Sequence, residues 1–312
     1  MSIAITPAMQ VKFQNNLEMQ LQQTKSKLES VAGAVIFGSE TGAEKIKVKD
    51  IIGNVAPQFA TERHGDTKYG NRSFDGIWIP KPDEGYDADL VDNADNLGTS
   101  LNLGSATMMS ITATVNRVKD QRVLEGFYGS IISGKTGTTT TAFPGGQTIA
   151  VTVGGAAGAQ KINTAKIRAA TKLLAQGYAD LDARRFMVLT ADDNDALLTE
   201  IPVSSSDFKE SYKGKVDDRG RVVGLLGWEF IYLELDNPLL GTIPALATDA
   251  SSYRKTPFWV EGGLVANYWQ NLRTMLDRLP GKLGSVQYFA GTTLAATRTQ
   301  PGMSGIILNQ KG

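Results

Sequence analysis

The sequence contains no cysteine and a single histidine among its 312 residues. Without cysteine the chain has no disulfide framework, no thiolate zinc site and no cysteine nucleophile. One histidine excludes any site that needs two, including the helical zinc-protease motif. His64 lies between Arg63 and Gly65 in a polar, loop-like segment. We therefore interpret it as a surface histidine and not as a general base.

An excess of one charge and a long apolar run are also missing. The 32 basic and 32 acidic residues balance, which argues against a protein whose main task is to grip nucleic acid or an anionic membrane. The most apolar stretch, 222–235, is interrupted by glycines and a glutamate, and it is shorter than the ~20 residues that span a bilayer. The amino terminus lacks the basic and apolar regions of a signal peptide. These features predict a soluble protein made in a cytoplasm.

Glycine, in contrast, is abundant. The chain has 33 glycines, roughly one residue in ten against a usual ~7%. With a hydrophobic fraction of 41%, this composition predicts a globular protein rich in turns, loops and β-structure. The length suits one large domain or two ordinary ones.

A thin apolar stripe marks the first predicted helix, over residues 8–31. Phe13, Leu17 and Leu21 fall on one face, and most of the other residues are polar. Such a stripe is too narrow to anchor a core. The segment is either an arm that lies on a neighbouring subunit or a surface helix that packs on its own domain.

Further helices are predicted over 104–128 and about 163–179, where apolar residues recur at intervals of three and four. The first would run roughly 37 Å, which is long for a globular protein. After the second, residues 186–189 predict a buried strand, Thr190 is the predicted N-cap of a short helix, and 222–235 predicts a strand pair or bent strand. Residues 160–240 therefore suggest a compact α+β subdomain.

Two adjacent segments carry opposite charge. Residues 45–51 alternate like a strand, and 58–80 predicts a long hairpin with an exposed polar tip. Basic residues gather on this hairpin and acidic residues follow it, a distribution suited to contact within one chain or between copies. Two solvated loops are the alternative. The basic residues are Arg63, Lys68, Arg72 and Lys81, and the acidic ones are Asp83, Glu84, Asp87, Asp89, Asp92 and Asp95.

Two further patterns suggest chemistry that their context does not support. Residues Gly129–Thr136 match the phosphate-binding loop G-x-x-x-x-G-K-[ST], which requires a strand before it and a helix after it. Here a predicted helix precedes the loop and a threonine run follows it, so we interpret the match as coincidental. The aspartates at 89, 92 and 95 could suggest a site for a hard cation, but their spacing of three matches no EF-hand. We predict no metal site, no cofactor and no catalytic set.

The order of these parts resembles a tailed-bacteriophage major capsid protein with the HK-ninety-seven-like fold. Residues 63–95 resemble the extended E-loop and the segment that returns from it. The long helix resembles the spine helix, which in this family ends in the pattern Asp-x-x-h-h-x-x-h-x-G, here Asp120 to Gly129. Residues 166–235 resemble the axial domain, and 279–309 resemble the closing strands of the peripheral domain.

The resemblance implies an α+β chain divided into an N-terminal arm (1–54), an E-loop (55–85), a peripheral domain (86–159 and 246–312) and an axial domain (160–245). It implies a shell protein, not an enzyme, that forms the hexamers and pentamers of an icosahedral virion around double-stranded DNA and is assembled in the host bacterial cytoplasm. Expected partners are further copies of the chain, a separate scaffolding protein, a portal and a decoration protein, with non-specific proximity to DNA and no membrane.

Contact residues follow from the same resemblance as hypotheses. Arg63, Lys68 and Arg72 would meet carboxylates of a neighbour, among them Asp83, Glu84 and Asp87, and the arm would lie on a neighbour through Phe13, Leu17 and Leu21. An encapsulin-like compartment shell shares the fold and stays open as an alternative, as does a nucleotide-binding enzyme that uses the Gly129–Thr136 loop. Nothing in the sequence selects a Lys–Asn pair for crosslinking.

Overall fold

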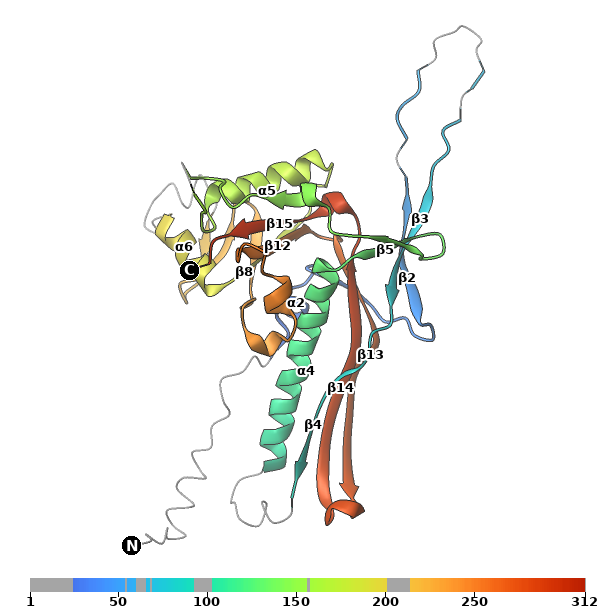
Figure 1. The fold of residues 1–312 in the computed structure, drawn as a ribbon, viewed down its shortest axis with the longest axis vertical. Coiled ribbons are helices and arrows are strands. Elements are labelled where there is room, and N and C mark those ends of the chain that lie inside the picture. Colours follow the sequence, from blue (N-terminus) through green and yellow to red (C-terminus); the bar gives the residue numbers. More distant parts are fainter. Residues whose placement is uncertain are drawn as a thin grey trace.

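Two parts project from the molecule on different sides (Figure 1). One consists of a long helix and an extended sheet, which we call the finger, and the other is a hairpin. The computed structural model describes residues 25–53, 55–59, 66–67, 69–92, 103–155, 158–200 and 214–311. Most of the predicted helix over 8–31, with Phe13, Leu17 and Leu21, lies outside these residues. Its last residues form the short helix α2, Lys27–Ser30.

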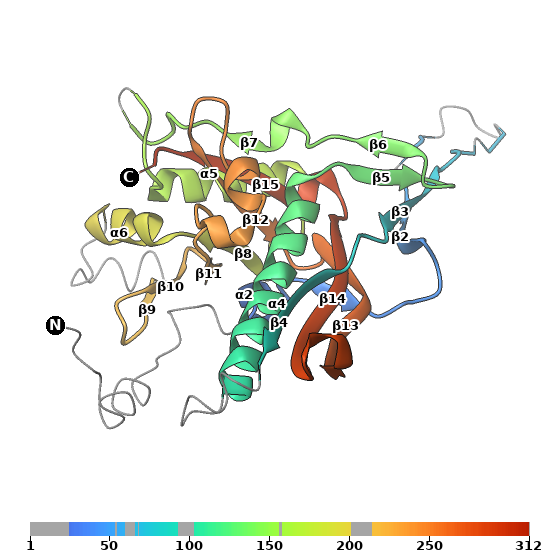
Figure 2. The same cartoon turned by 60° about the horizontal axis from the view of Figure 1, so that its bottom comes forward.

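The finger contains the predicted long helix as α4, Leu103–Tyr128. This helix lies along a four-stranded sheet whose order is β1-β13-β14-β4 (Figure 2). At Gly126 a Cβ atom would lie 2.2 Å from the backbone oxygen of Ala296 in β14, so only glycine allows this close packing. The strands are β1 Ile36–Gly38, β4 Gly85–Val91, β13 Leu264–Leu279 and β14 Ser285–Arg298.

The hairpin is made by β2 and β3, which pair antiparallel. Its first arm begins at Lys45, inside the segment predicted to be the N-terminal arm, whereas the sequence predicted the hairpin over 58–80 and the E-loop over 55–85. The reason is the alternation of residues 45–51, which places Ile46 opposite Ile79 with both side chains buried. The sheet continues as β2-β3-β5-β6, with β2 Lys45–Ile52, β3 Phe74–Pro80, β5 Ile131–Gly134 and β6 Thr139–Thr141.

A seven-stranded sheet, in the order β7-β15-β12-β8-β11-β10-β9, forms the rest of the molecule. It confirms the predicted buried strand as β8 and the predicted strand pair as β10 and β11. It also extends past the boundary predicted at residue 245, because β12 and β15 return from the later sequence to pair beside β8. The strands are β7 Thr148–Ile149, β8 Arg185–Leu189, β9 Lys215–Val216, β10 Val222–Leu225, β11 Trp228–Tyr232, β12 Arg254–Val260 and β15 Ser304–Asn309.

Different elements cover the two faces of this sheet. Apolar residues of α5, Thr164–Gln176, and α6, Ala191–Glu200, pack on one face. The end of α4, α2 and the segment with α8, Ile243–Leu246, pack on the other. In the described part of the chain, no helix is both long and apolar enough to cross a membrane. Four short 3-10 turns complete the fold: Gly145–Gln147, Pro238–Leu240, Pro280–Lys282 and Pro301–Met303.

Candidate assembly surfaces

One buried carboxylate fixes the start of the described chain to the middle of α4. Asp120 accepts hydrogen bonds from the Ser26 hydroxyl at 2.7 Å and from the backbone N–H groups of Lys27 and Leu28 at 3.0 and 3.1 Å. A carboxylate at the first turn of a helix satisfies its free N–H groups. Asp120 is the first residue of the pattern that ends at Gly129. The short helix α2 is therefore attached to the side of α4.

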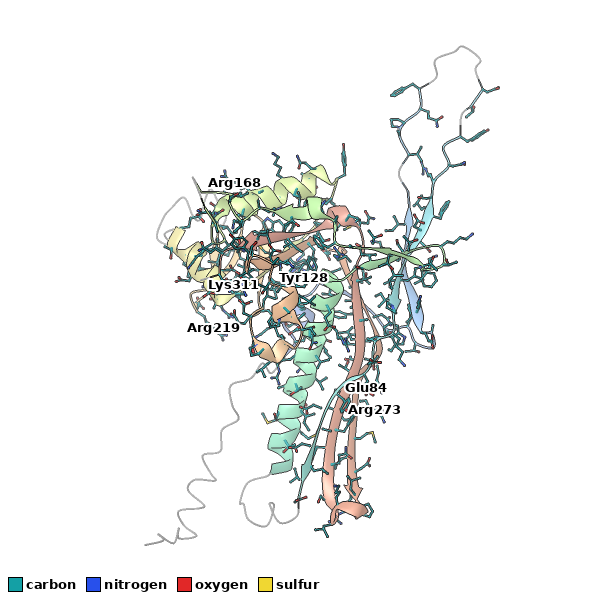
Figure 3. The ribbon with its side chains drawn as sticks, in the orientation of Figure 1. Glu84, Tyr128, Arg168, Arg219, Arg273 and Lys311 are labelled. Atoms are coloured by element: carbon teal, nitrogen blue, oxygen red, sulfur yellow. The ribbon has the colours of Figure 1, made fainter. Side chains whose placement is uncertain are left out.

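The face of the finger turned away from α4 carries a groove of about 340 Å³. In β14, Ala290 packs against α4, so its neighbour Phe289 points to the opposite face. There Phe289 stacks on Tyr86 with ring centroids 5.5 Å apart, and Arg273 lies 5.5 Å above the same ring. Glu84 approaches Arg273 at 3.7 Å (Figure 3). Met275, Asp277 and Gln287 complete the lining.

The outer face of the finger has exposed apolar side chains and one buried polar atom without a hydrogen-bond partner among the described residues. Tyr86 is 63% exposed, and Leu90 and Met275 are also exposed. The Glu84 Oε1 atom is buried and has no hydrogen-bond partner among the described residues. Exposed aromatic and aliphatic side chains around a carboxylate are typical of a protein contact surface.

The hairpin presents a second exposed apolar surface. Phe59, Tyr69 and Phe74 are 83%, 88% and 68% exposed. Arg72 lies between the last two in the sequence and is exposed as well. The predicted contact residues Arg63 and Lys68 lie outside the described residues. Aromatic side chains beside a guanidinium group match the composition of interface centres.

The structure does not bring Arg72 and the acidic segment together within one chain. The hairpin and β4, which carries Asp87, project in different directions (Figure 1). Part of the acidic segment has basic neighbours of its own. Burial lowers the pKa of Arg117 and the nearby Asp87 opposes that shift, while Arg122 donates to the backbone oxygen of Asp83 at 3.3 Å.

Sequence reasoning missed the residues of β13 and β14 that share this face. Arg273 and Phe289 are distant in sequence from Glu84 and Tyr86. They become neighbours only through the register that pairs Gly291 with Tyr86 and with Arg273. No periodic or motif signal marks that register in the sequence.

The loop at Gly129–Thr136 has no phosphate-binding geometry. It follows the end of α4 and consists of strand β5 and a turn into β6, so no helix N-terminus faces it. Its Gly134 has a positive φ, and the Gly134 carbonyl accepts a hydrogen bond from the Trp78 indole at 2.8 Å. Gly134 therefore allows the tight turn between β5 and β6, which pair antiparallel.

A buried ionic cluster holds the seven-stranded sheet to α6. Arg254 of β12 is almost fully buried and donates to Thr190 at 2.7 Å, to Asp192 at 2.9 Å and to Asp236 at 2.7 Å. It also lies 3.5 Å from the buried Asp193. Burial raises the pKa of the Asp193 carboxyl, and Arg254 opposes that shift. The cluster is structural, because its members bond to one another.

Lys166 of α5 is a buried cation without a carboxylate within bonding distance. Its ammonium group donates to the backbone oxygens of Gln160 and Leu308 and to the Asn309 side chain, at 2.7 to 3.0 Å. Burial lowers the pKa of Lys166 from 10.5 to about 8. The folded protein therefore binds this proton more weakly than the unfolded chain does.

Replacing this lysine is expected to change how stability depends on pH. Between about pH 8 and pH 10.5 the unfolded wild-type chain holds the Lys166 proton and the folded chain has lost it. Wild type should therefore gain stability relative to Lys166→Met as the pH rises, by at most ~1.4 kcal/mol per pH unit. Urea unfolding of both proteins across this range measures the difference. A constant difference would show that the buried amine does not titrate there.

The chain is similar to known proteins in sequence and in fold. Residues 5–311 match the family described as phage capsid protein. The fold is similar to the capsid of cyanophage Pam1 (TM-score 0.67, 11% identity, 96% of both chains covered) and to the mature capsid of bacteriophage PhiM1 (0.66, 11%, 95% of this chain and 90% of that one). The capsid of Ralstonia phage GP4 is similar too (0.62, 12%, 95% and 94%). A search of curated protein sequences finds no match.

Proposed function

The chain belongs to the phage capsid protein family, and from this premise we propose that it is the major capsid protein whose copies form the hexamers and pentamers of an icosahedral head around double-stranded DNA. The predicted HK-ninety-seven-like fold is confirmed. The observation that carries the proposal is the pair of incomplete surfaces, on the hairpin and on the outer face of the finger. They differ from each other, so copies associate head to tail, and such a contact forms a ring when the rotation between successive copies closes.

The contact between copies joins the hairpin of one to the outer face of the finger of the next. The aromatic side chains of the hairpin cover Tyr86 and Met275, and Arg72 meets the carboxylates of Asp83 and Glu84. Asp87, whose side chain lies on the α4 side of the edge strand β4, is reached by Arg72 around that edge. Arg63 and Lys68 belong to the same basic side of the contact. Opposite charges set the register, while the apolar area supplies most of the stabilisation. The stripe of Phe13, Leu17 and Leu21 lies on a neighbour as a second contact.

Each part of the fold then has a role in the shell. The finger with α4 acts as the peripheral domain, and the seven-stranded sheet with α5 and α6 acts as the axial domain around the rings. The protein works by assembly and not by catalysis. It is assembled in the host cytoplasm with a separate scaffolding protein and a portal, and it ends in the virion, where a decoration protein is a further partner.

Electron microscopy of the purified full-length chain, alone and coexpressed with the neighbouring head genes, tests the proposal. Closed shells, or rings of five and six subunits, are the expected result. A protein that stays monomeric under every assembly condition would overturn it.

A further inference from the structure

The acidic residues are unevenly distributed along the chain, although its total charge is balanced. Residues 126–179 contain no aspartate and no glutamate, although acidic residues make up about a tenth of the sequence. The same segment has five basic residues, so the remainder of the chain carries the compensating negative charge. The basic residues are Lys135, Lys161, Lys166, Arg168 and Lys172.

The segment forms β5, β6, β7 and α5, which run along one side of the molecule (Figures 1 and 2). The helix α5 covers the sheet face opposite the one covered by α4. The helix α5 therefore lies on the far side of the seven-stranded sheet from the spine helix α4, while β7 is an edge strand of that sheet and β5 and β6 belong to the sheet of the hairpin.

The outer stripe of α5 is positively charged. Ile167, Ala170 and Leu174 face the core, and Arg168 and Lys172 are exposed one turn apart with Lys161 before them (Figure 3). None of these three cations forms a salt bridge with a residue in the described part of the chain. Their charge is therefore available to a partner.

An exposed aromatic residue ends the same helix. Tyr178 is 97% exposed and adopts a positive φ of 55°. It occupies the left-handed position that closes a helix, with its N–H bonded to the carbonyl of Ala175 and the next N–H bonded to that of Leu174. Glycine is usual at this position, because a Cβ atom disfavours the left-handed conformation. The Tyr178 side chain packs against almost nothing in the described part of the chain, so it is available to a partner.

We propose that the stripe of Lys161, Arg168 and Lys172, together with Tyr178, faces the enclosed DNA and contacts its phosphates. This inference rests on the proposed capsid function and identifies the inner face of the axial domain. Lysine, arginine and tyrosine side chains are common donors to phosphate oxygens, and such contacts require no base sequence. No carboxylate belongs to the stripe itself, because α5 has no acidic residue. The nearest acidic helix on the same sheet face is α6, whose Glu200 accepts hydrogen bonds from Thr164 at the start of α5.

Few charges per subunit make the contact weak and dependent on salt. Three phosphates neutralised by Lys161, Arg168 and Lys172 predict an affinity that falls roughly 40-fold between ~50 and ~200 mM salt. A weak contact repeated over a shell holds the outer layer of DNA without preventing its release.

Replacing the strained tyrosine is expected to stabilise the fold. Tyr178→Gly removes the cost of the left-handed conformation and replaces a side chain that is almost fully exposed, so the midpoint of urea unfolding should shift to a higher concentration. Urea unfolding of the unassembled chain measures the change. Equal or lower stability would show that Tyr178 is supported by its own chain.

Lysine footprinting on intact particles tests the DNA contact directly. DNA-filled heads and emptied heads are treated with a small amine-reactive reagent, and the labelled lysines are quantified by mass spectrometry. Lys161 and Lys172 should be protected severalfold in filled heads, and the exposed Lys215 and Lys282 should react equally in both. Equal reactivity of Lys161 and Lys172 in the two samples would overturn the inference, including the case in which a neighbouring subunit covers them.

A charge-reversal variant gives an independent measurement. The unassembled triple variant Lys161→Glu, Arg168→Glu and Lys172→Glu should bind a short duplex DNA at least about tenfold more weakly than wild type at low salt. The control triple Lys45→Glu, Lys215→Glu and Lys282→Glu has the same change in charge and should bind more tightly than the first. Equal loss in both would contradict a specific face. If wild type forms shells and yet shows neither effect, only this inference fails, whereas failure to form shells refutes the proposed function.

Discussion

Arg254→Met is expected to lower the unfolding free energy of the unassembled chain by about 3–5 kcal/mol, the usual cost of removing one partner of a buried ion pair. Arg254 is the cation shared by Asp192, Asp193 and Asp236, and its side chain is 2% exposed. Methionine fills much of the volume but leaves Asp193 buried without its counter-charge. The loss is therefore electrostatic and not a packing defect.

The pH dependence separates these two causes. Burial already raises the pKa of Asp193 in the wild type, and loss of Arg254 removes the opposing effect. The folded variant then binds a proton more readily than its unfolded chain does, so its stability should recover as the pH falls. Urea unfolding at neutral and mildly acidic pH measures this recovery. A deficit that stays constant with pH would contradict the electrostatic explanation.

A second substitution controls for a variant that folds poorly. Adding Asp193→Asn to Arg254→Met removes the unpaired charge and keeps an oxygen that accepts the hydrogen bonds from Thr190. The double variant should be more stable than Arg254→Met alone, because the two positions are coupled. Simple addition of two losses would show that Arg254 and Asp193 act independently.

Arg72→Glu is expected to prevent shell formation while the subunit stays folded. Arg72 is exposed, so its substitution should change the unfolding free energy by less than about 0.5 kcal/mol. In the assembled state the same change places a carboxylate against Asp83, Glu84 and Asp87. Repeated at every hairpin, the repulsion should reduce the yield of shells at least about tenfold. Sedimentation and electron microscopy of the assembly reaction measure that yield.

Charge reversal on the other side supplies the matched control. Asp83→Arg or Asp87→Arg, combined with Arg72→Glu, should restore part of the yield, and Arg72→Lys should assemble nearly as wild type. Normal shells from Arg72→Glu would refute the contact. Loss of folding in that variant would also refute it, because Arg72 would then act within its own chain.

The parts of the fold that depend on local periodicity could be predicted from the sequence. The 3–4 spacing of Ile111, Val115 and their neighbours predicted α4 to within about one residue, since one buried face determines a long helix. The strand pair at 222–235 follows from apolar runs separated by a glycine turn, and Gly227 there has a positive φ. These signals lie within a few residues of each other.

Features set by distant pairing could not be predicted. The alternation of residues 45–51 predicts a strand, but it does not show that this strand pairs with β3, more than twenty residues later, to form the hairpin. Arg254 appears in the sequence as one more basic residue, and only the return of β12 beside β8 places it among three carboxylates. The partner of Arg72 could not be located within the chain, because a surface completed by another copy leaves no signal in one sequence.

Cysteine pairing in assembled particles tests the contact between copies most directly. The chain has no cysteine, so every disulfide observed would come from the introduced residues. Arg72→Cys combined with Asp83→Cys, and separately with Asp87→Cys, is assembled and oxidised, and the products are separated under denaturing, non-reducing conditions. The account predicts a ladder of linked subunits that ends at pentamers and hexamers for at least one pair. Particles that assemble normally and yield only monomers for both pairs would contradict it.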